Sequence, residues 1–122
     1  MNTTLDLFEA ATLSLTRPTP MKDRLADAYR NHLAYVNEQE LPSDVCEEFR
    51  ALTSTLTRER PMQRGEDALR ATVRKMSNDE MANAASAVVR MFSAVSRASA
   101  DAARESPDKD ITNVVPLYAA KA

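Results

Sequence analysis

The side chains best suited to chemistry in this sequence are those of His32 and Cys46, each the single residue of its type. If the helices on either side of residues 38–41 fold back on each other, His32 lies level with Cys46 and Glu47. An imidazole, a thiol and a carboxylate together can bind a metal ion or activate the thiol. A half-buried histidine beside a cysteine that packs as a small hydrophobe explains the same pattern, and we favour it. We therefore predict no catalytic, cofactor or metal site, and an enzyme or metal site at His32 and Cys46 is the third hypothesis for function.

A basic segment in the middle of the chain is the second candidate. Residues 50–75 carry seven Lys or Arg against three Asp or Glu, whereas residues 1–49 carry four against nine. Clustered arginines can hold phosphates, so a nucleic-acid-associated regulator is the alternative hypothesis. Its ligand-binding residues would be Arg58, Arg60, Arg64, Arg70, Arg74 and Lys75.

Several features argue against nucleic acid as the partner of this segment. Acidic residues interrupt it, no aromatic residue lies within it for base stacking, and the net charge of the whole chain is −2. We expect instead an exposed helix face on which Glu66 pairs with Arg70, four residues further on. The acidic first half of the chain offers a further outlet, by contacting this segment within the chain or in a second copy.

The elements that position these residues are predicted to be helices. The chain of 122 residues has one glycine, Gly65, whereas β-hairpins and bulges need several. Apolar residues recur at helical spacing in five segments, which we expect near residues 3–17, 20–37, 42–58, 66–76 and 77–105. Short connections between helices indicate antiparallel neighbours. The sequence therefore predicts an antiparallel bundle of about five helices over residues 1–105, with an extended or disordered tail at 106–122.

Two parts of this bundle are specific enough to test. Ser77-Asn78-Asp79-Glu80 is a capping box, in which the Ser77 hydroxyl and the Glu80 carboxylate each accept a backbone N–H. We expect the more exposed Glu80 to contribute less than Ser77. In the hairpin of the second and third helices, Tyr29 is expected near Phe49.

The last helix is predicted to be about ten residues longer than any other. Its apolar stripe continues past the expected end of the bundle, so that part needs cover from the tail or from a second copy. We expect a homodimer in which the last helices pair. The interaction residues predicted from this reasoning are Phe92, Val95, Ala102, Val115, Leu117 and Tyr118.

Composition narrows the class of protein. One cysteine excludes an internal disulfide, no secretory signal begins the chain, and no apolar run approaches the ~20 residues of a membrane span. No Gly-rich phosphate loop, nucleophile elbow, Walker motif or zinc pattern is present. We expect a small, non-enzymatic, cytoplasmic protein, of a size and composition typical of bacteria, that acts by protein–protein interaction without a cofactor.

Overall fold

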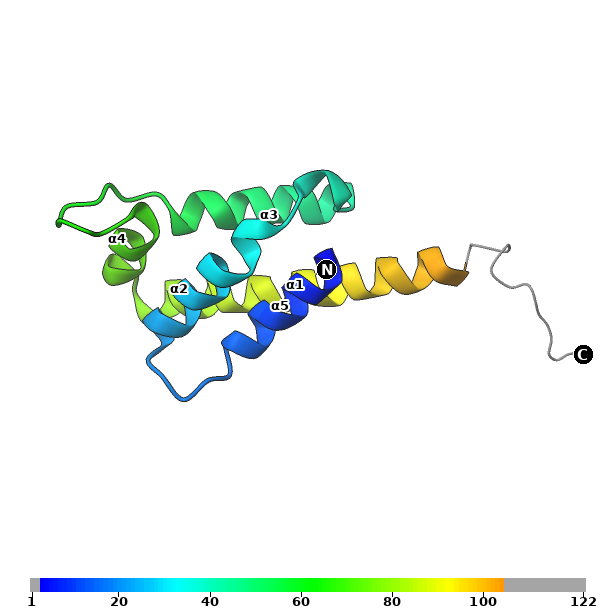
Figure 1. Cartoon of the computed structure of the whole chain (residues 1–122), viewed down its shortest axis with the longest axis horizontal. Helices are drawn as coiled ribbons and strands as arrows, with labels where there is room; N and C mark the ends of the chain where they lie inside the picture. Colours follow the sequence, from blue (N-terminus) through cyan, green and yellow to red (C-terminus); the bar gives the residue numbers. More distant parts are fainter. Residues whose placement is uncertain (1–2, 105–122) are drawn as a thin grey trace, which may run out of the picture.

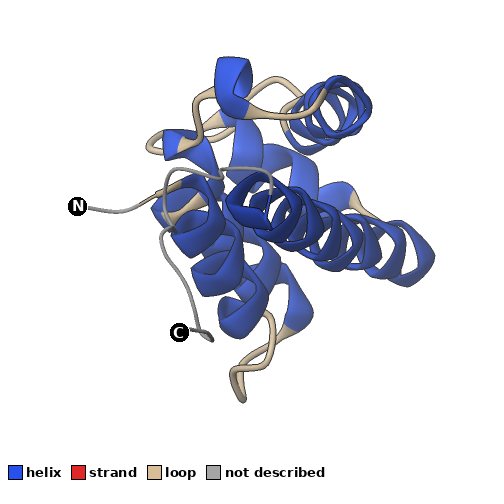
Figure 2. Cartoon of the chain, turned by 90° about the vertical axis from the view of Figure 1, so that its right-hand side faces the viewer, coloured by secondary structure: helices blue, strands red, loops and turns tan. Residues whose placement is uncertain are grey.

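The computed structural model describes residues 3–104, and every regular element in that range is helical (Figure 2). The five α-helices are α1 (Thr4–Ser14), α2 (Met21–Asn31), α3 (Ser43–Leu56), α4 (Ala68–Lys75) and α5 (Asn78–Arg104). Two 3₁₀ turns, η1 (Leu33–Tyr35) and η2 (Glu38–Glu40), connect α2 to α3. The all-helical class is confirmed, and the antiparallel order of the whole bundle stays a prediction.

Side-chain caps fix the starts of the first and last helices. The Thr3 hydroxyl accepts the N–H of Asp6 at 3.1 Å, and the Asp6 carboxylate accepts the N–H of Thr3 at 3.2 Å. The predicted box at α5 is confirmed: the Ser77 hydroxyl accepts the N–H of Glu80 at 3.1 Å, and Glu80 accepts the N–H of Ser77 at 2.9 Å. Both helices therefore begin where short polar side chains satisfy otherwise unpaired donors.

The second helix is shorter than predicted, because it ends at Asn31 rather than near residue 37. His32 leaves the helical region with φ −134° and ψ −61°, and the 3₁₀ turn η1 follows it. Leu33 and Val36 are three residues apart, a spacing that a 3₁₀ turn satisfies as well as an α-helix does. The apolar pattern alone could not distinguish the two, and the continuous helix was the wrong interpretation.

The long helix α5 is the centre of the packing (Figure 1). Helices α1, α2 and α3 all pack against it, while α4 lies against α2 and α3. The predicted hairpin of α2 and α3 is wrong, since α2 packs mainly on α1, α4 and α5. The reason is the connection, which spans residues 32–42 and contains both 3₁₀ turns instead of one tight turn at 38–41.

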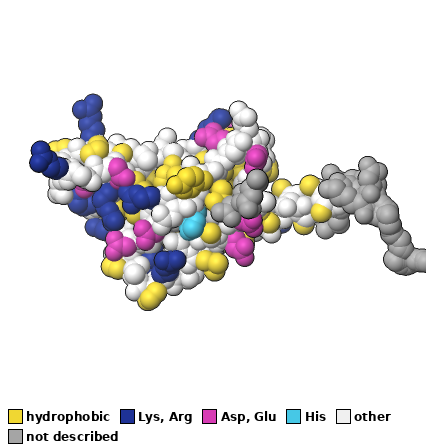
Figure 3. Space-filling view, viewed as in Figure 1, with side chains coloured by type: hydrophobic (Ala, Val, Ile, Leu, Met, Phe, Trp, Pro, Cys, Tyr) yellow, Lys and Arg dark blue, Asp and Glu magenta, His cyan; other side chains and the backbone are white. Residues whose placement is uncertain are grey.

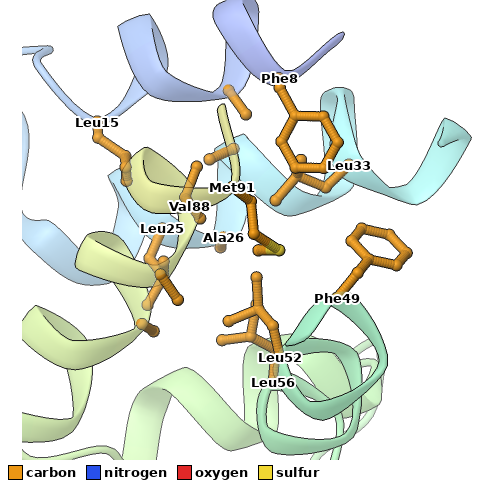
Figure 4. Close-up of a cluster of buried hydrophobic side chains, with 14 of the residues drawn as sticks. Phe8, Leu15, Leu25, Ala26, Leu33, Phe49, Leu52, Leu56, Val88 and Met91 are labelled. Atoms are coloured by element: carbon orange, nitrogen blue, oxygen red, sulfur yellow. The ribbon is translucent and has the colours of Figure 1, made fainter. Parts of the chain in front are cut away.

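One apolar core holds these helices together (Figure 4). Phe8 of α1 meets Phe49 of α3 edge to face, with ring centroids 6.1 Å apart and an interplanar angle of 70°. Such an aromatic pair adds roughly 0.5–1.5 kcal/mol beyond the area it buries. Val88 and Met91 present α5 to the same cluster and are fully buried. Tyr29, expected beside Phe49, is half-buried against this core.

None of the helices within residues 3–104 combines the length and apolar character needed to cross a membrane.

Candidate functional site

The three residues of the proposed metal or thiol site are not gathered into one. His32 is the residue that ends α2, and Cys46 lies in the first half of α3, partly buried against the core. Within residues 3–104, no three His, Cys, Asp or Glu side chains come together in a group that could hold a metal ion. His32 was expected beside Cys46 and Glu47 only if α2 and α3 formed a hairpin. Since they do not, this expected arrangement is dropped.

Most of the basic segment is engaged in ion pairs with carboxylates. These pairs are Arg50–Glu38 (2.7 Å), Arg58–Glu80 (3.1 Å), Arg70–Asp23 (3.0 Å), Arg74–Glu66 (2.8 Å) and Lys75–Glu59 (3.3 Å). Figure 3 shows the basic side chains interspersed with acidic ones at the end of the molecule that carries α4. Guanidinium groups that already hold carboxylates are poorly placed to bind phosphates as well.

The predicted pairing of Glu66 with Arg70 is wrong. Pairing at four residues requires both side chains on one helix, but α4 begins at Ala68 with Asp67 as its cap. Glu66 therefore precedes the helix and accepts two hydrogen bonds from Arg74, at 2.8 and 3.2 Å. Arg70 turns instead to Asp23 on α2.

Arg60 and Arg64 are the exceptions in the basic segment. Both are exposed in the connection between α3 and α4, and neither forms an ion pair with any residue that the structure describes. Between them lies Met62, whose side chain is 72% exposed. The connection therefore exposes an apolar side chain between two guanidinium groups that have no carboxylate partner within residues 3–104, and we call residues 60–64 the docking loop.

The docking loop has a defined shape because Glu66 holds it. The Glu66 side chain is only 5% exposed, and its carboxylate accepts the N–H of Met62 at 3.2 Å while it binds Arg74. The N–H of Glu66 donates to the carbonyl of Gln63 at 3.1 Å, and Gly65 adopts a φ of +80° that favours glycine. The hydrogen bonds from Arg74 hold the pKa of the Glu66 carboxyl below its usual value. The carboxylate therefore stays ionised at neutral pH and keeps the loop tied to α4.

A second open surface lies at the other end of the molecule, where α5 projects beyond the other helices (Figure 1). A groove of about 460 Å³ lies between the start of α1, the start of α3 and the last third of α5. Its lining is mostly apolar or small: Thr3, Thr4, Leu5, Glu40, Leu41, Pro42, Val95, Ala98, Ser99 and Ala102. We call this the α5 groove.

The structure treats the predicted interaction residues unequally. Val95 is only 7% exposed and belongs to the core, so α5 is covered further along its length than predicted. Phe92 is half-buried against the same core, and Ala102 is exposed in the α5 groove. Val95 is therefore covered within the chain, and Phe92 is covered in part. Val115, Leu117 and Tyr118 lie outside the described residues.

Most of the groove and Met62 of the docking loop were not predicted from the sequence, whereas Arg60 and Arg64 were predicted only as candidate ligands for phosphates. Leu5 and Leu41 belong to segments 36 residues apart, and no local pattern says that both meet α5. Met62 did carry a usable signal, because it is an apolar residue with arginines on both sides in the connection between α3 and α4. Comparison of this chain with protein-family models, with curated proteins and with solved structures finds no match.

Proposed function

We propose that this chain is a non-enzymatic protein that acts by binding other protein, and that a second copy of itself is the partner. The observation that supports this proposal is the α5 groove, an apolar hollow left open at the base of a projecting helix. Residues 96–104 extend α5 by nine residues past Val95, or about 14 Å at 1.5 Å per residue. Apolar surface that stays open to solvent where a helix leaves the core offers a place for a second chain to bind.

The alternatives draw less support from the described residues. A nucleic-acid regulator would present its cations on one free face, whereas most of those in residues 50–75 pair with carboxylates. An enzyme at His32 and Cys46 would need a third group to orient or activate the thiol, and no group of three His, Cys, Asp or Glu side chains that could hold a metal ion forms within residues 3–104.

The proposal is tested by the concentration dependence of molecular mass, measured by sedimentation velocity or light scattering. Ala102→Glu places a charge in the groove, and an unpaired charge is costly to bury. We expect the wild-type chain to associate and Ala102→Glu to need at least about tenfold more protein, equivalent to ~1.4 kcal/mol. The matched control is Ala100→Glu, which is exposed on α5 outside the groove and should associate like the wild type. A wild-type chain that stays monomeric at its highest soluble concentration would refute self-association.

A chain that ends at Glu105 separates a second copy from the last residues of the same chain as the cover. This truncation keeps every buried apolar side chain that residues 3–104 contribute, from Leu7 to Val95. We expect both lengths to associate alike. A full-length monomer whose shortened form associates would show that residues 106–122 occupy the groove, and would contradict the proposal.

A further inference from the structure

The docking loop has the chemistry needed to fill an apolar hollow on another surface. It presents one flexible apolar side chain, Met62, on a backbone fixed by the Glu66 carboxylate. Methionine adapts to irregular apolar hollows because it is unbranched and polarisable. On either side, Arg60 and Arg64 lack carboxylate partners within residues 3–104. The loop therefore fits an apolar hollow with an acidic rim.

The α5 groove has the complementary chemistry, an apolar hollow with acidic residues around it. Its floor is apolar, and Glu40 contributes a carboxylate to its wall. Asp6 in the first turn of α1 and Asp44 in the first turn of α3 are exposed, and each is close in sequence to a residue that lines the groove, Leu5 or Pro42. Asp6 accepts the backbone N–H of Thr3, Asp44 accepts that of Val45, and Glu40 accepts the hydroxyl of Thr4. None of these three acids pairs with a cation within residues 3–104. Figure 3 shows acidic side chains near the point where α5 leaves the body of the molecule.

The docking loop and the α5 groove lie at opposite ends of one molecule. In Figure 1 the connection between α3 and α4 is at one extreme, and the starts of α1 and α3 are at the other beside the projecting α5. A loop held by α4 and a groove built on α5 cannot meet within one chain. Any contact between them joins two copies in a heterologous, head-to-tail manner, which closes into a ring or continues as a chain.

We infer that the docking loop of one copy binds the α5 groove of the next, with Met62 in the hollow and Arg60 and Arg64 facing the acidic rim. This inference rests on the proposed function, because it requires self-association, and it replaces the two-fold pairing of last helices by a head-to-tail contact. Complementary charge at both ends steers the encounter and fixes its orientation. Added salt weakens the contact, since these charges are exposed in the free protein.

Two defective variants that repair each other provide the test. Met62→Asp spoils the loop and leaves the groove intact, whereas Ala102→Glu spoils the groove and leaves the loop intact. Each alone should need at least tenfold more protein to associate than the wild type. Mixed in equal amounts, they should form a one-to-one heterodimer that grows no further, because only one functional loop meets one functional groove. The control is Leu13→Asp, which changes another exposed apolar residue and should associate like the wild type.

Each outcome of this test decides between the inference and its rivals. Circular dichroism first establishes that every variant is folded, and Ala98→Glu replaces Ala102→Glu if that variant is not. If Met62→Asp associates normally while Ala102→Glu does not, the groove binds a copy by another surface: the proposed function stands and the inference is overturned. Two weakened variants that stay apart on mixing also overturn it. A wild-type chain that stays monomeric overturns both the proposed function and the inference. The same holds if it binds a mixed-sequence DNA duplex through Arg64 and does not associate.

Discussion

Removing the hydroxyl that caps α5 should destabilise the fold by a predictable amount. In Ser77→Ala the N–H of Glu80 loses its acceptor at 3.1 Å, while the rest of the helix keeps its contacts. Loss of a Ser cap costs about 1 kcal/mol, a sizeable share of the roughly 5–15 kcal/mol that stabilise a small domain. For a domain near 100 residues this corresponds to a fall in Tm of about 4–8 °C.

A urea titration followed by circular dichroism measures this loss as a lower midpoint with an unchanged slope. Ser86→Ala, also on α5 but exposed and without a side-chain hydrogen bond within residues 3–104, is the control and should not lower the midpoint. If Ser77→Ala leaves the midpoint unchanged, α5 does not depend on its cap and our account of its start is wrong.

The structure also changes the expected order of the two capping residues. The Glu80 carboxylate accepts the N–H of Ser77 at 2.9 Å and binds Arg58 at 3.1 Å, and these hydrogen bonds hold the pKa of Glu80 below its usual value. Glu80→Ala breaks both contacts. We therefore expect it to lower the urea midpoint at least as much as Ser77→Ala, contrary to the expectation from the sequence.

Two further predictions concern the core and the docking loop. Phe49→Ala removes a buried ring and its edge contact with Phe8, and should cost roughly 3–5 kcal/mol in the same titration; a loss below about 1 kcal/mol would mean that this pair does not organise the core. Arg74 lowers the pKa of Glu66 in the folded protein, so the unfolded chain binds more protons in acid. The contribution of Glu66 to the free energy of unfolding is therefore complete above the unfolded pKa of about 4.3 and is lost as the pH falls through the folded pKa. The urea midpoint should therefore fall as the pH drops below the unfolded pKa of about 4.3, and an equally steep fall in Glu66→Gln would show that another group causes it.

Helix positions could be predicted from the sequence where a side chain ends or begins the helix locally. Thr3 and Ser77 cap the neighbouring backbone through hydrogen bonds spanning three residues, and both starts were predicted correctly. Pro42 marks the start of α3 in the same local way. Such signals depend on a few adjacent residues, so they survive whatever the rest of the chain does.

Features that depend on distant packing could not be predicted in this way. The end of α2 depends on how Leu33 enters the core, and periodicity places that residue equally well in an α-helix or a 3₁₀ turn. The partner of Glu66 depends on whether residue 66 lies inside α4, a boundary that was predicted two residues too early. The misplaced end of α2 also led to the wrong hairpin, and with it to the wrong alignment of His32 with Cys46.

The uneven charge along the sequence takes on a different meaning once the fold is known. Most basic residues of the middle segment meet acidic residues within the chain, and exposed pairs of this kind contribute only about 0–1 kcal/mol each. Arg60 and Arg64 contribute no pair within residues 3–104, and Met62 is mostly in solvent, so replacing any of them should cost the fold little. A loss of association in a docking-loop variant therefore reports a lost contact between copies rather than a weakened fold. A charge reversal at the acidic rim tests the same contact. A Glu40→Arg chain should recover affinity for a copy that carries Arg64→Glu.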